Sequence, residues 1–199
     1  MAKPTEESKK KIKRLTRYLI NAPRVIVRYP WQGRVATMSG FSDSDWAGCQ
    51  KTAKSTSGGV MLKGRHYIKS WSTTQKTIAL SSGEAELVAI VKMSTELLGI
   101  IQLMNEWNHK VEAEVLADST TALAVVNRKG NGKMRHVRIG KLWIQQKRED
   151  GELKYEKVLG TKNPADMMTK HIKAADIEVQ LERMGMRTEE GRAREGLKL

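Results

Sequence analysis

The chain has 199 residues, of which 39% are hydrophobic and 29% charged, and 36 lysines and arginines against 22 acidic residues give a net charge of +14. This length suits one domain with appendages, and the apolar share excludes a disordered polypeptide. A single cysteine excludes an internal disulfide and a cysteine-rich zinc site, and fits a reducing compartment. Because no apolar run approaches the roughly 18–20 residues of a membrane span and no signal region follows the lysine-rich start, we expect a soluble, non-secreted protein without a membrane partner.

The positive charge is uneven along the chain. Residues 1–35 carry 10 basic and 2 acidic groups, residues 36–172 carry 20 and 14, and residues 173–199 carry 6 of each. A strongly basic protein favours a polyanionic partner, of which nucleic acid is the commonest. Most of the acidic residues of this basic protein therefore lie in its central segment.

The first 34 residues predict a helix and a short strand. Residues 5–21 place Ile12, Leu15 and Leu19 on one face, with a basic cluster around the other. That cluster predicts either a solvated face or a phosphate contact. Residues 24–29 predict a short strand.

From about residue 35 the pattern changes to a β-meander followed by alternating helices and strands. Three extended runs are joined by glycine- and lysine-rich turns, and a long helix with an apolar stripe at three- and four-residue spacing follows over residues 81–107. The later predicted elements are a strand at 111–118, a short helix at 119–130, a basic helix at 134–148, a strand at 152–160 and a helix opening at 163–172. This order predicts an α/β fold with a mixed sheet and helices on its faces.

Two acids, Asp43 and Asp45, stand at the end of the first strand of the meander. Acids there are either solvated turn residues or part of a metal site, and further carboxylates from elsewhere would favour the metal. In the long helix, Glu84 fits a capping box with Ser81. Glu86 lies one turn before Ile90, on the buried face of the helix. An ionised acid is unfavourable there unless it is paired or bound to metal.

Two more acids occupy positions with both a structural and a functional interpretation. Asp118 ends the strand at 111–118, where it can cap the next helix or join a site at the carboxyl end of the sheet. Asp166 follows Asn163 and Pro164 in the first turn of a predicted helix, where it also favours the helix dipole.

The order of these acids resembles the ribonuclease H fold, and longer motifs strengthen the resemblance. FSDSDWAG, STSGGVMLKG, SWSTTQKTIALSSGEAEL, VLADSTTAL, KMRHVRIGKLWI and LGTKNPADMMTK, within residues 41–170, look like the ribonuclease H domain of copia-type (LTR) retrotransposon polyproteins. Residues 1–34 look like the end of the connection segment of the preceding reverse transcriptase. The implied organisation is that segment, a ribonuclease H domain at 35–172 with about five strands, and a C-terminal part at 173–199 with a helix near 174–184 and a frayed end.

The resemblance implies a catalytic and metal-binding set of Asp43, Glu86, Asp118 and Asp166, holding two Mg²⁺ ions, with Mn²⁺ as a substitute. Carboxylates without a cysteine or histidine cluster suit these hard cations. The implied reaction is hydrolysis of the RNA strand of RNA/DNA hybrids by a two-metal mechanism. The implied partners are the hybrid and a reverse transcriptase domain, and the implied location is intracellular: the cytoplasm, with virus-like particles and the nucleus as further compartments.

Residues that contact the substrate are less sharply indicated. Ser44 and Ser119 are small polar neighbours of catalytic acids, with turn hydrogen bonding as the alternative. The basic segment 128–148 has eight lysines and arginines and no acid, so it is either a clamp for nucleic-acid backbones or a solvated face. Trp46 and Trp71 are expected in the core rather than as base-stacking platforms. The candidate contacts are Ser44, Ser119, Lys133, Arg135, His136 and Arg138.

Two other functions fit the same fold. One is a connection-like module that binds nucleic acid without cleaving it, which the retention of all four acids disfavours, because a binder of polyanions gains nothing from focused negative charge without metal. The other is the catalytic core of a DDE-type integrase or transposase. A glutamate early in the first long helix and an aspartate in the last helix favour the hydrolase arrangement.

Overall fold

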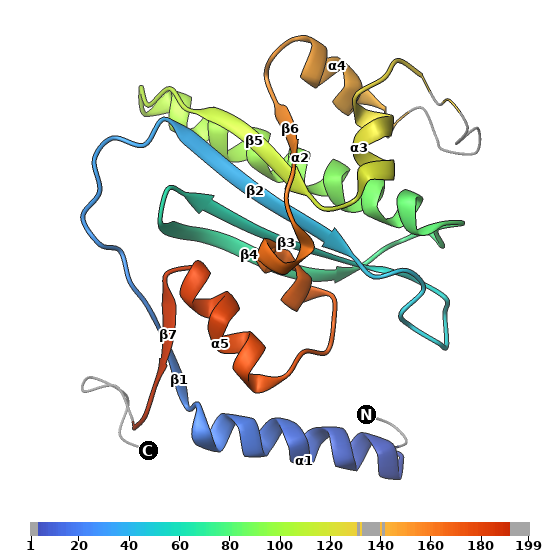
Figure 1. Cartoon of the computed structure of the whole chain (residues 1–199), viewed down its shortest axis with the longest axis vertical. Coiled ribbons are helices and arrows are strands. Elements are labelled where there is room, and N and C mark those ends of the chain that lie inside the picture. The colour runs from blue at the N-terminus through green and yellow to red at the C-terminus, as the bar shows by residue number, and fades with distance from the viewer. Residues whose placement is uncertain (1–3, 131, 133–139, 141, 192–199) are drawn as a thin grey trace. The chain divides into compact units, whose positions relative to one another are not determined.

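The computed structural model describes residues 4–130, 132, 140 and 142–191 (Figure 1). The chain forms two compact units. The larger one is Tyr29–His171, and the smaller one combines Met1–Arg28 with Ile172–Leu199. The two terminal segments, expected as separate parts of the chain, thus belong to one unit.

The larger unit is built on a five-stranded mixed sheet with the strand order β4-β3-β2-β5-β6. Strands β2, β3 and β4 form an antiparallel meander, whereas β5 is parallel to β2, and β6 is parallel to β5. The strands are β2 (Thr37–Ser44), β3 (Thr56–Lys63), β4 (His66–Thr74), β5 (Glu112–Ala117) and β6 (Lys154–Lys157). The structure therefore confirms the predicted α/β fold, with a three-strand antiparallel meander and parallel strands in one mixed sheet.

Helices and short 3-10 segments complete this unit. They are α2 (Ser82–Glu106), α3 (Thr120–Val126), α4 (Trp143–Glu149), η2 (Gly160–Lys162) and η3 (Pro164–Met168). The helix expected to open at residues 163–172 is instead the five-residue 3-10 segment η3, which ends where the Thr169 hydroxyl and N–H both turn back to the Asp166 carbonyl. Of the basic helix expected at 134–148, only α4 is seen, and residues 133–139 and 141 lie outside the described part.

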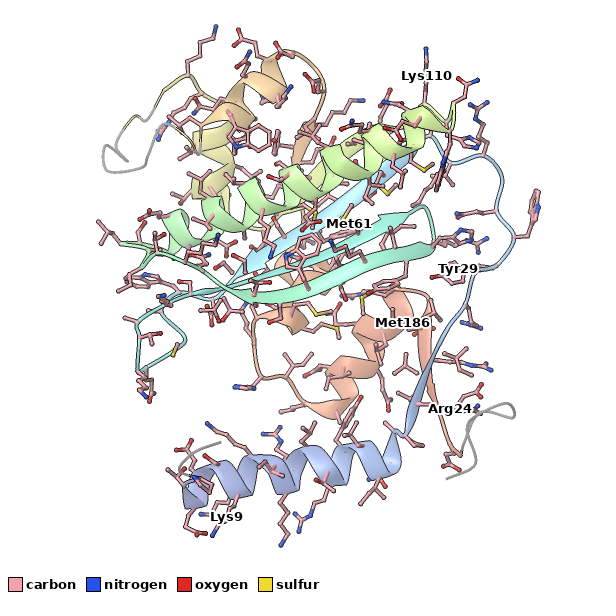
Figure 2. The ribbon with its side chains drawn as sticks, turned by 180° about the vertical axis from the view of Figure 1, so that it is seen from behind. Lys9, Arg24, Tyr29, Met61, Lys110 and Met186 are labelled. Atoms are coloured by element: carbon pink, nitrogen blue, oxygen red, sulfur yellow. The ribbon has the colours of Figure 1, made fainter. Side chains whose placement is uncertain are left out.

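The core lies between the sheet and α2. Helix α2 packs on β2, β3 and β5, and Figure 2 shows it running along the sheet near Met61. A Cβ at Gly40 in β2 would fall 2.5 Å from the Met93 sulfur, so the glycine allows α2 to approach the strand closely. The large side chains buried here include Met38, Met61, Leu87, Ile90, Met93, Leu97 and Val115.

By length and composition α2 reaches the limit for a membrane-crossing helix, although Lys92 and Glu96 interrupt its apolar residues, so the helix contains no uninterrupted apolar run of that length. The apolar residues of α2 explain why the helix reaches it. They supply the buried stripe of a core helix, and helices of that kind pass the same test.

The two tryptophans expected in the core differ. Trp71 on β4 is partly buried and packs against the core, with the ammonium groups of Lys69 and Lys92 5.7 and 5.6 Å from its ring. Trp46 is 56% exposed, and its indole N–H donates a 3.1 Å hydrogen bond to the Ala79 carbonyl. The prediction for Trp46 was therefore wrong, because the residue lies beyond the end of β2 and the described residues leave more than half of it exposed.

The smaller unit contains the predicted N-terminal helix and a pair of strands, of which only the first was predicted. Helix α1 (Glu6–Asn21) starts at the Thr5 cap and buries none of its residues. Strand β1 (Arg24–Val27) pairs antiparallel with β7 (Met186–Glu189), which follows α5 (Ala174–Arg183). The predicted C-terminal helix is present, but residues 186–189 form a strand instead of fraying, because β1 supplies hydrogen-bonding partners.

Candidate metal centre

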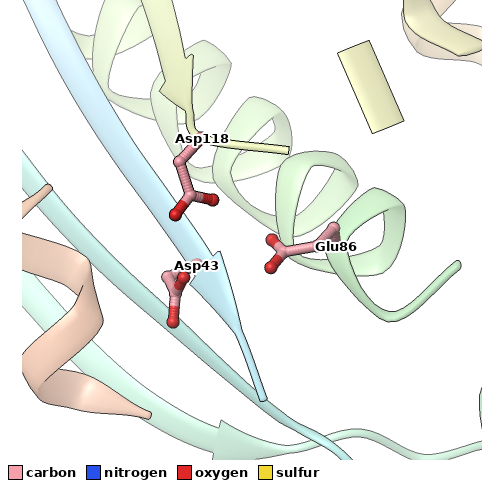
Figure 3. Close-up of side chains that lie close together, drawn as sticks. All are labelled: Asp43, Glu86 and Asp118. Carbon is pink, nitrogen blue, oxygen red and sulfur yellow. The ribbon is translucent and has the colours of Figure 1, made fainter. Parts of the chain in front are cut away.

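Three carboxylates from three different elements meet at one edge of the larger unit. One oxygen each from Asp43, Glu86 and Asp118 lie within 4.8 Å of one another. Figure 3 shows the three side chains converging from β2, from α2 and from the residue after β5. Segments separated by 75 positions of sequence thus bring like charges together, which is unfavourable unless protons or cations compensate.

Asp43 is placed by the alternation of side chains along β2. Gly40 faces α2, so Asp43, three residues later, points to the opposite face, which η3 covers. Its register partner on β3 is Gly58, where a Cβ would fall 2.8 Å from the Ala165 carbonyl oxygen and from side-chain atoms of the same segment. The glycine therefore lets η3 pack directly beside Asp43.

Asp118 is placed by the parallel pairing of β2 and β5. Ser42 and Ala117 are register partners, so the next residues, Asp43 and Asp118, lie side by side at the carboxyl ends of the two strands. The cap of α3 is Ser119, which accepts a 3.2 Å hydrogen bond from the Ala122 N–H. The alternative role of Asp118 as a helix cap is thereby excluded, and its carboxylate stays available to the site.

Glu86 is placed by the start of α2. Ser81 caps the helix as predicted, and Glu84 turns back to accept a 2.9 Å hydrogen bond from the Leu80 N–H, one residue before the expected partner. Glu86, two residues further on, points toward the other two acids instead (Figure 3). Its Oε2 is buried and has no hydrogen-bond partner among the described residues.

Burial and mutual repulsion change the protonation of this cluster. Burial, followed by the charges of Asp43 and Asp118, raises the pKa of Glu86 to about 8, although the Ser44 N–H and Lys170 oppose the shift. Burial also raises the pKa of Asp43, against the hydrogen bond from Thr169 and the charge of Lys170. Without a cation, the protein keeps Glu86 protonated near neutral pH.

Asp166, the fourth predicted acid, lies near the other three without joining them directly. Its Oδ1 is in contact with the Lys170 ammonium, which also lies 3.8 Å from Asp43 Oδ1. Thr169 donates a hydrogen bond to Asp43 Oδ2. Asn163 ties the segment to the sheet, because its Nδ2 donates a 2.9 Å hydrogen bond to the Ser42 carbonyl.

This donor set fits a divalent cation. All candidate ligands are carboxylate oxygens, which Mg²⁺ and Mn²⁺ prefer, and the buried Glu86 Oε2 lacks the partner that such an ion would supply. Asp43, Glu86 and Asp118 would hold one ion directly. Asp166 and Asp43 flank the Lys170 ammonium, and a second ion would have to displace that ammonium to bind both carboxylates.

The sequence is related to retrotransposon proteins. It is 30% identical to the retrovirus-related Pol polyprotein from transposon TNT 1-94 of Nicotiana tabacum over 151 residues, 75% of this chain and 11% of that protein. It is also 30% identical to the polyprotein from transposon RE1 of Arabidopsis thaliana over 173 residues, 85% of this chain and 12% of that protein. The chain is a homologue of the Pol polyproteins of plant retrotransposons.

This Pol homologue spans about a ninth of the length of the curated relatives that it matches. No family model matches it. Among solved structures it is similar to LC11-RNase H1, isolated from compost by a metagenomic approach, with 17% identity, 67% of this chain and 93% of that chain covered, and a TM-score of 0.49. The predicted family of retrotransposon polyproteins is thus confirmed by the sequence relatives.

The predicted substrate contacts of the Pol homologue lie in different environments, and some lie outside the described residues. Ser44 is buried, and its hydroxyl lies 2.8 and 3.0 Å from the carbonyls of Asp45 and Thr56 and 3.1 Å from Gln75 Nε2. These bonds are the structural alternative for Ser44, and its contact with substrate stays a prediction. Ser119 caps α3, and its role toward substrate stays a prediction. The remaining candidates, Lys133, Arg135, His136 and Arg138, lie outside the described residues.

Sequence reasoning missed Thr169 and Lys170, the two residues that approach Asp43 from the turn after η3. The spacing of Asp166 and Lys170 by four positions suggests an ion pair, which would have drawn attention to Lys170. Burial lowers the pKa of Lys170, but Asp166, Asp43 and Asp118 outweigh that effect and raise it. No local signal in the sequence links Thr169 to Asp43, 126 positions away.

Proposed function

We propose that this chain is a metal-dependent endonuclease that hydrolyses the RNA strand of RNA/DNA hybrids during retrotransposon reverse transcription. The observation that carries the proposal is the meeting of Asp43, Glu86 and Asp118 within 4.8 Å, with one buried oxygen of Glu86 unpartnered. A purely structural role for three gathered acids is disfavoured, because unpaired buried carboxylates destabilise the fold.

The proposed ligands are Asp43, Glu86, Asp118 and Asp166, and the proposed ions are two Mg²⁺, with Mn²⁺ as a substitute. When bound, such ions activate a water molecule and stabilise the leaving 3′-oxygen in an in-line displacement at phosphorus. The protein holds the ligands on a strand end, a helix start and an anchored 3-10 segment, so little reorganisation accompanies metal binding. Thr169 orients the Asp43 carboxylate by its hydrogen bond.

The hybrid substrate is proposed from the relatives and from charge. Retrotransposon Pol proteins copy RNA into DNA, and the template strand must then be removed. A net charge of +14 favours binding of a doubly polyanionic duplex, while the acids focus negative charge only at the site. Distinguishing the RNA strand requires contacts to its 2′-hydroxyl groups.

The proposed partner protein is a reverse transcriptase domain, linked in the same polyprotein or associated with it. The relatives are polyproteins of which this chain matches 11% and 12%. We therefore also propose that it acts inside the cell, where reverse transcription takes place.

A cleavage assay tests the proposal. The protein is incubated with end-labelled RNA/DNA hybrid, single-stranded RNA and duplex DNA, each with Mg²⁺, with Mn²⁺ and with EDTA. We expect cleavage of the hybrid's RNA strand alone, and none with EDTA. Asp118→Asn should abolish cleavage while hybrid binding persists, because the amide removes a ligand charge without changing shape.

Asp150→Asn is the matched control, since Asp150 is an exposed aspartate at the end of α4 and outside the acidic group. It should cleave as the unmodified chain does. Cleavage that survives Asp118→Asn would reject the proposed site. Hybrid binding without any cleavage would favour the non-catalytic module, and cleavage of duplex DNA in place of hybrid would favour an integrase-like core.

A further inference from the structure

Lys170 already supplies a positive charge to the candidate metal centre. Its ammonium contacts Asp166 Oδ1 and lies 3.8 Å from Asp43 Oδ1, so it stands between the two acids that a second metal ion would bridge. Among the described residues, no other lysine or arginine forms a salt bridge with Asp43, Glu86, Asp118 or Asp166.

The position of Lys170 is explained by the charges around it. Asp43 is only 1% exposed, and a buried carboxylate with no cation nearby is strongly unfavourable. Thr169 satisfies one of its oxygens by a neutral hydrogen bond, which leaves Lys170 as the compensating charge near the other. The ammonium therefore compensates the negative charges of Asp43 and Asp166, as a bound metal cation would.

The Lys170 ammonium can leave its position between Asp43 and Asp166. Its side chain is 49% exposed, and a flexible four-carbon stem lets the ammonium swing into solvent without moving the backbone. The acids, in contrast, are held by β2 and by the Asn163 anchor of η3. A cation that enters between Asp43 and Asp166 would thus displace Lys170 while leaving its ligands in place.

We propose that Lys170 is a built-in counter-ion that occupies the cation position between Asp43 and Asp166 in the metal-free protein and is displaced when a divalent ion binds there. The inference rests on the proposed function in that it takes these acids as metal ligands. It implies that the second ion binds more weakly than the acids alone would dictate, because it competes with the lysine.

Mn²⁺ binding measures this competition. Free Mn²⁺ is titrated by its electron paramagnetic resonance signal at low ionic strength, with the full chain and with Lys170→Gln. We expect the weaker of two Mn²⁺ sites to tighten about fivefold in Lys170→Gln, as for a lost competing ion pair that is partly screened by solvent. Lys170→Arg should not tighten it.

Lys162→Gln is the matched control for a general change in charge. Lys162 is exposed on η2, near Gly160, where a Cβ would fall 3.0 Å from Asp118 Oδ2. No salt bridge between described residues joins Lys162 to the four acids. Its substitution should leave the weaker site within about twofold of the original. If the weaker site binds Mn²⁺ equally more tightly in both variants, the effect comes from the loss of one positive charge at long range. That result would overturn the proposal.

A second readout follows the ammonium itself. Lysines are dimethylated with ¹³C-formaldehyde, and the Lys170 resonance is identified by its absence from Lys170→Gln. Addition of Mg²⁺ should move this resonance toward the position of exposed lysines. A resonance unmoved by Mg²⁺ at saturation would overturn the proposal.

The outcomes separate this proposal from the nuclease assignment. Tightening of the weaker site without hybrid cleavage would support the counter-ion and refute the nuclease. Metal-dependent cleavage with identical Mn²⁺ affinities in both proteins would refute the counter-ion and keep the nuclease. Absence of Mn²⁺ binding in either protein would overturn both.

Discussion

Asp43 and Gly58 are register partners across β2 and β3, and the missing side chain of Gly58 is the space that η3 and Thr169 fill. A Cβ there would fall 2.8 Å from the Ala165 carbonyl oxygen and from Thr169 Cγ2. The glycine thus sets how closely the Thr169 hydroxyl and the Asp166 carboxylate of η3 approach Asp43. Gly58 therefore shapes the site, although it has no side chain that could bind metal or substrate.

Gly58→Ala is therefore expected to move η3 away from Asp43. The free energy of unfolding should fall by about 1–3 kcal/mol through overpacking. Metal-dependent hybrid cleavage should fall by more than the loss of folded protein explains, roughly tenfold or more, since a small misplacement of ligands is strongly felt. Urea unfolding and cleavage rates at saturating Mg²⁺ measure the two effects. Unchanged cleavage in the folded variant would contradict this account of the glycine.

Gly99→Ala should have the opposite effect on stability. Gly99 is exposed in α2, and a Cβ there would meet nothing within 4 Å. Alanine in place of a helical glycine should raise the free energy of unfolding by about 0.5–1 kcal/mol. Cleavage should be unchanged, so the variant also serves as the control for Gly58→Ala. A destabilised Gly99→Ala would show that α2 makes contacts absent from this structure.

The raised pKa of Glu86, about 8 against an ordinary value of 4.5, predicts a pH-dependent stability of the metal-free protein. Between these values the folded protein keeps a proton that the unfolded chain has released. The free energy of unfolding should therefore fall as the pH rises through this window, and Asp43, whose pKa is also raised, acts in the same direction.

Glu86→Gln should remove most of this dependence. The amide mimics the protonated acid and stays neutral, so in EDTA the variant should be more stable than the unmodified chain by about 4 kcal/mol at pH 8.5 and by less than about 1 kcal/mol at pH 5. Urea unfolding at both pH values measures the difference. Parallel pH profiles for the two proteins would show that Glu86 is ionised without metal.

Trp46 is expected to contribute to hybrid binding. It is 56% exposed, follows Asp43 by three residues, and is fixed by its hydrogen bond to the Ala79 carbonyl. An oriented indole offers a stacking surface for a base, an interaction worth about 1–3 kcal/mol. In an Asp118→Asn background, Trp46→Ala should weaken binding of fluorescent hybrid about tenfold, as measured by anisotropy.

Trp107→Ala is the matched control for Trp46. Trp107 is 63% exposed at the opposite end of α2, so its loss removes a comparable aromatic surface away from the acids. It should leave hybrid affinity within about twofold of the parent. If both substitutions weaken binding equally, stacking on Trp46 has no special role.

Local patterns in the sequence predicted most of the larger unit. Alternating strands, the Ser81 cap and the apolar stripe of α2 depend on neighbours within a few residues, so periodicity was sufficient to find them. The positions of the acids at a strand end and a helix start were predicted on the same basis. The exposure of Trp46 and the strand at residues 186–189 were not, because each depends on which distant segment covers or pairs with it.

The sequence by itself determined the chemical character of the site: carboxylates on a basic chain, without cysteine or histidine clusters, and motifs of retrotransposon Pol proteins. Only the tertiary structure decided that Asp43, Glu86 and Asp118 meet. It also decided that Asp166 pairs with the ammonium of Lys170 and that the Ser44 hydroxyl forms hydrogen bonds within the protein. The physical reason is that local propensity acts over a turn or a strand pair. Electrostatic compensation, in contrast, acts between side chains that come together only when the sheet is assembled.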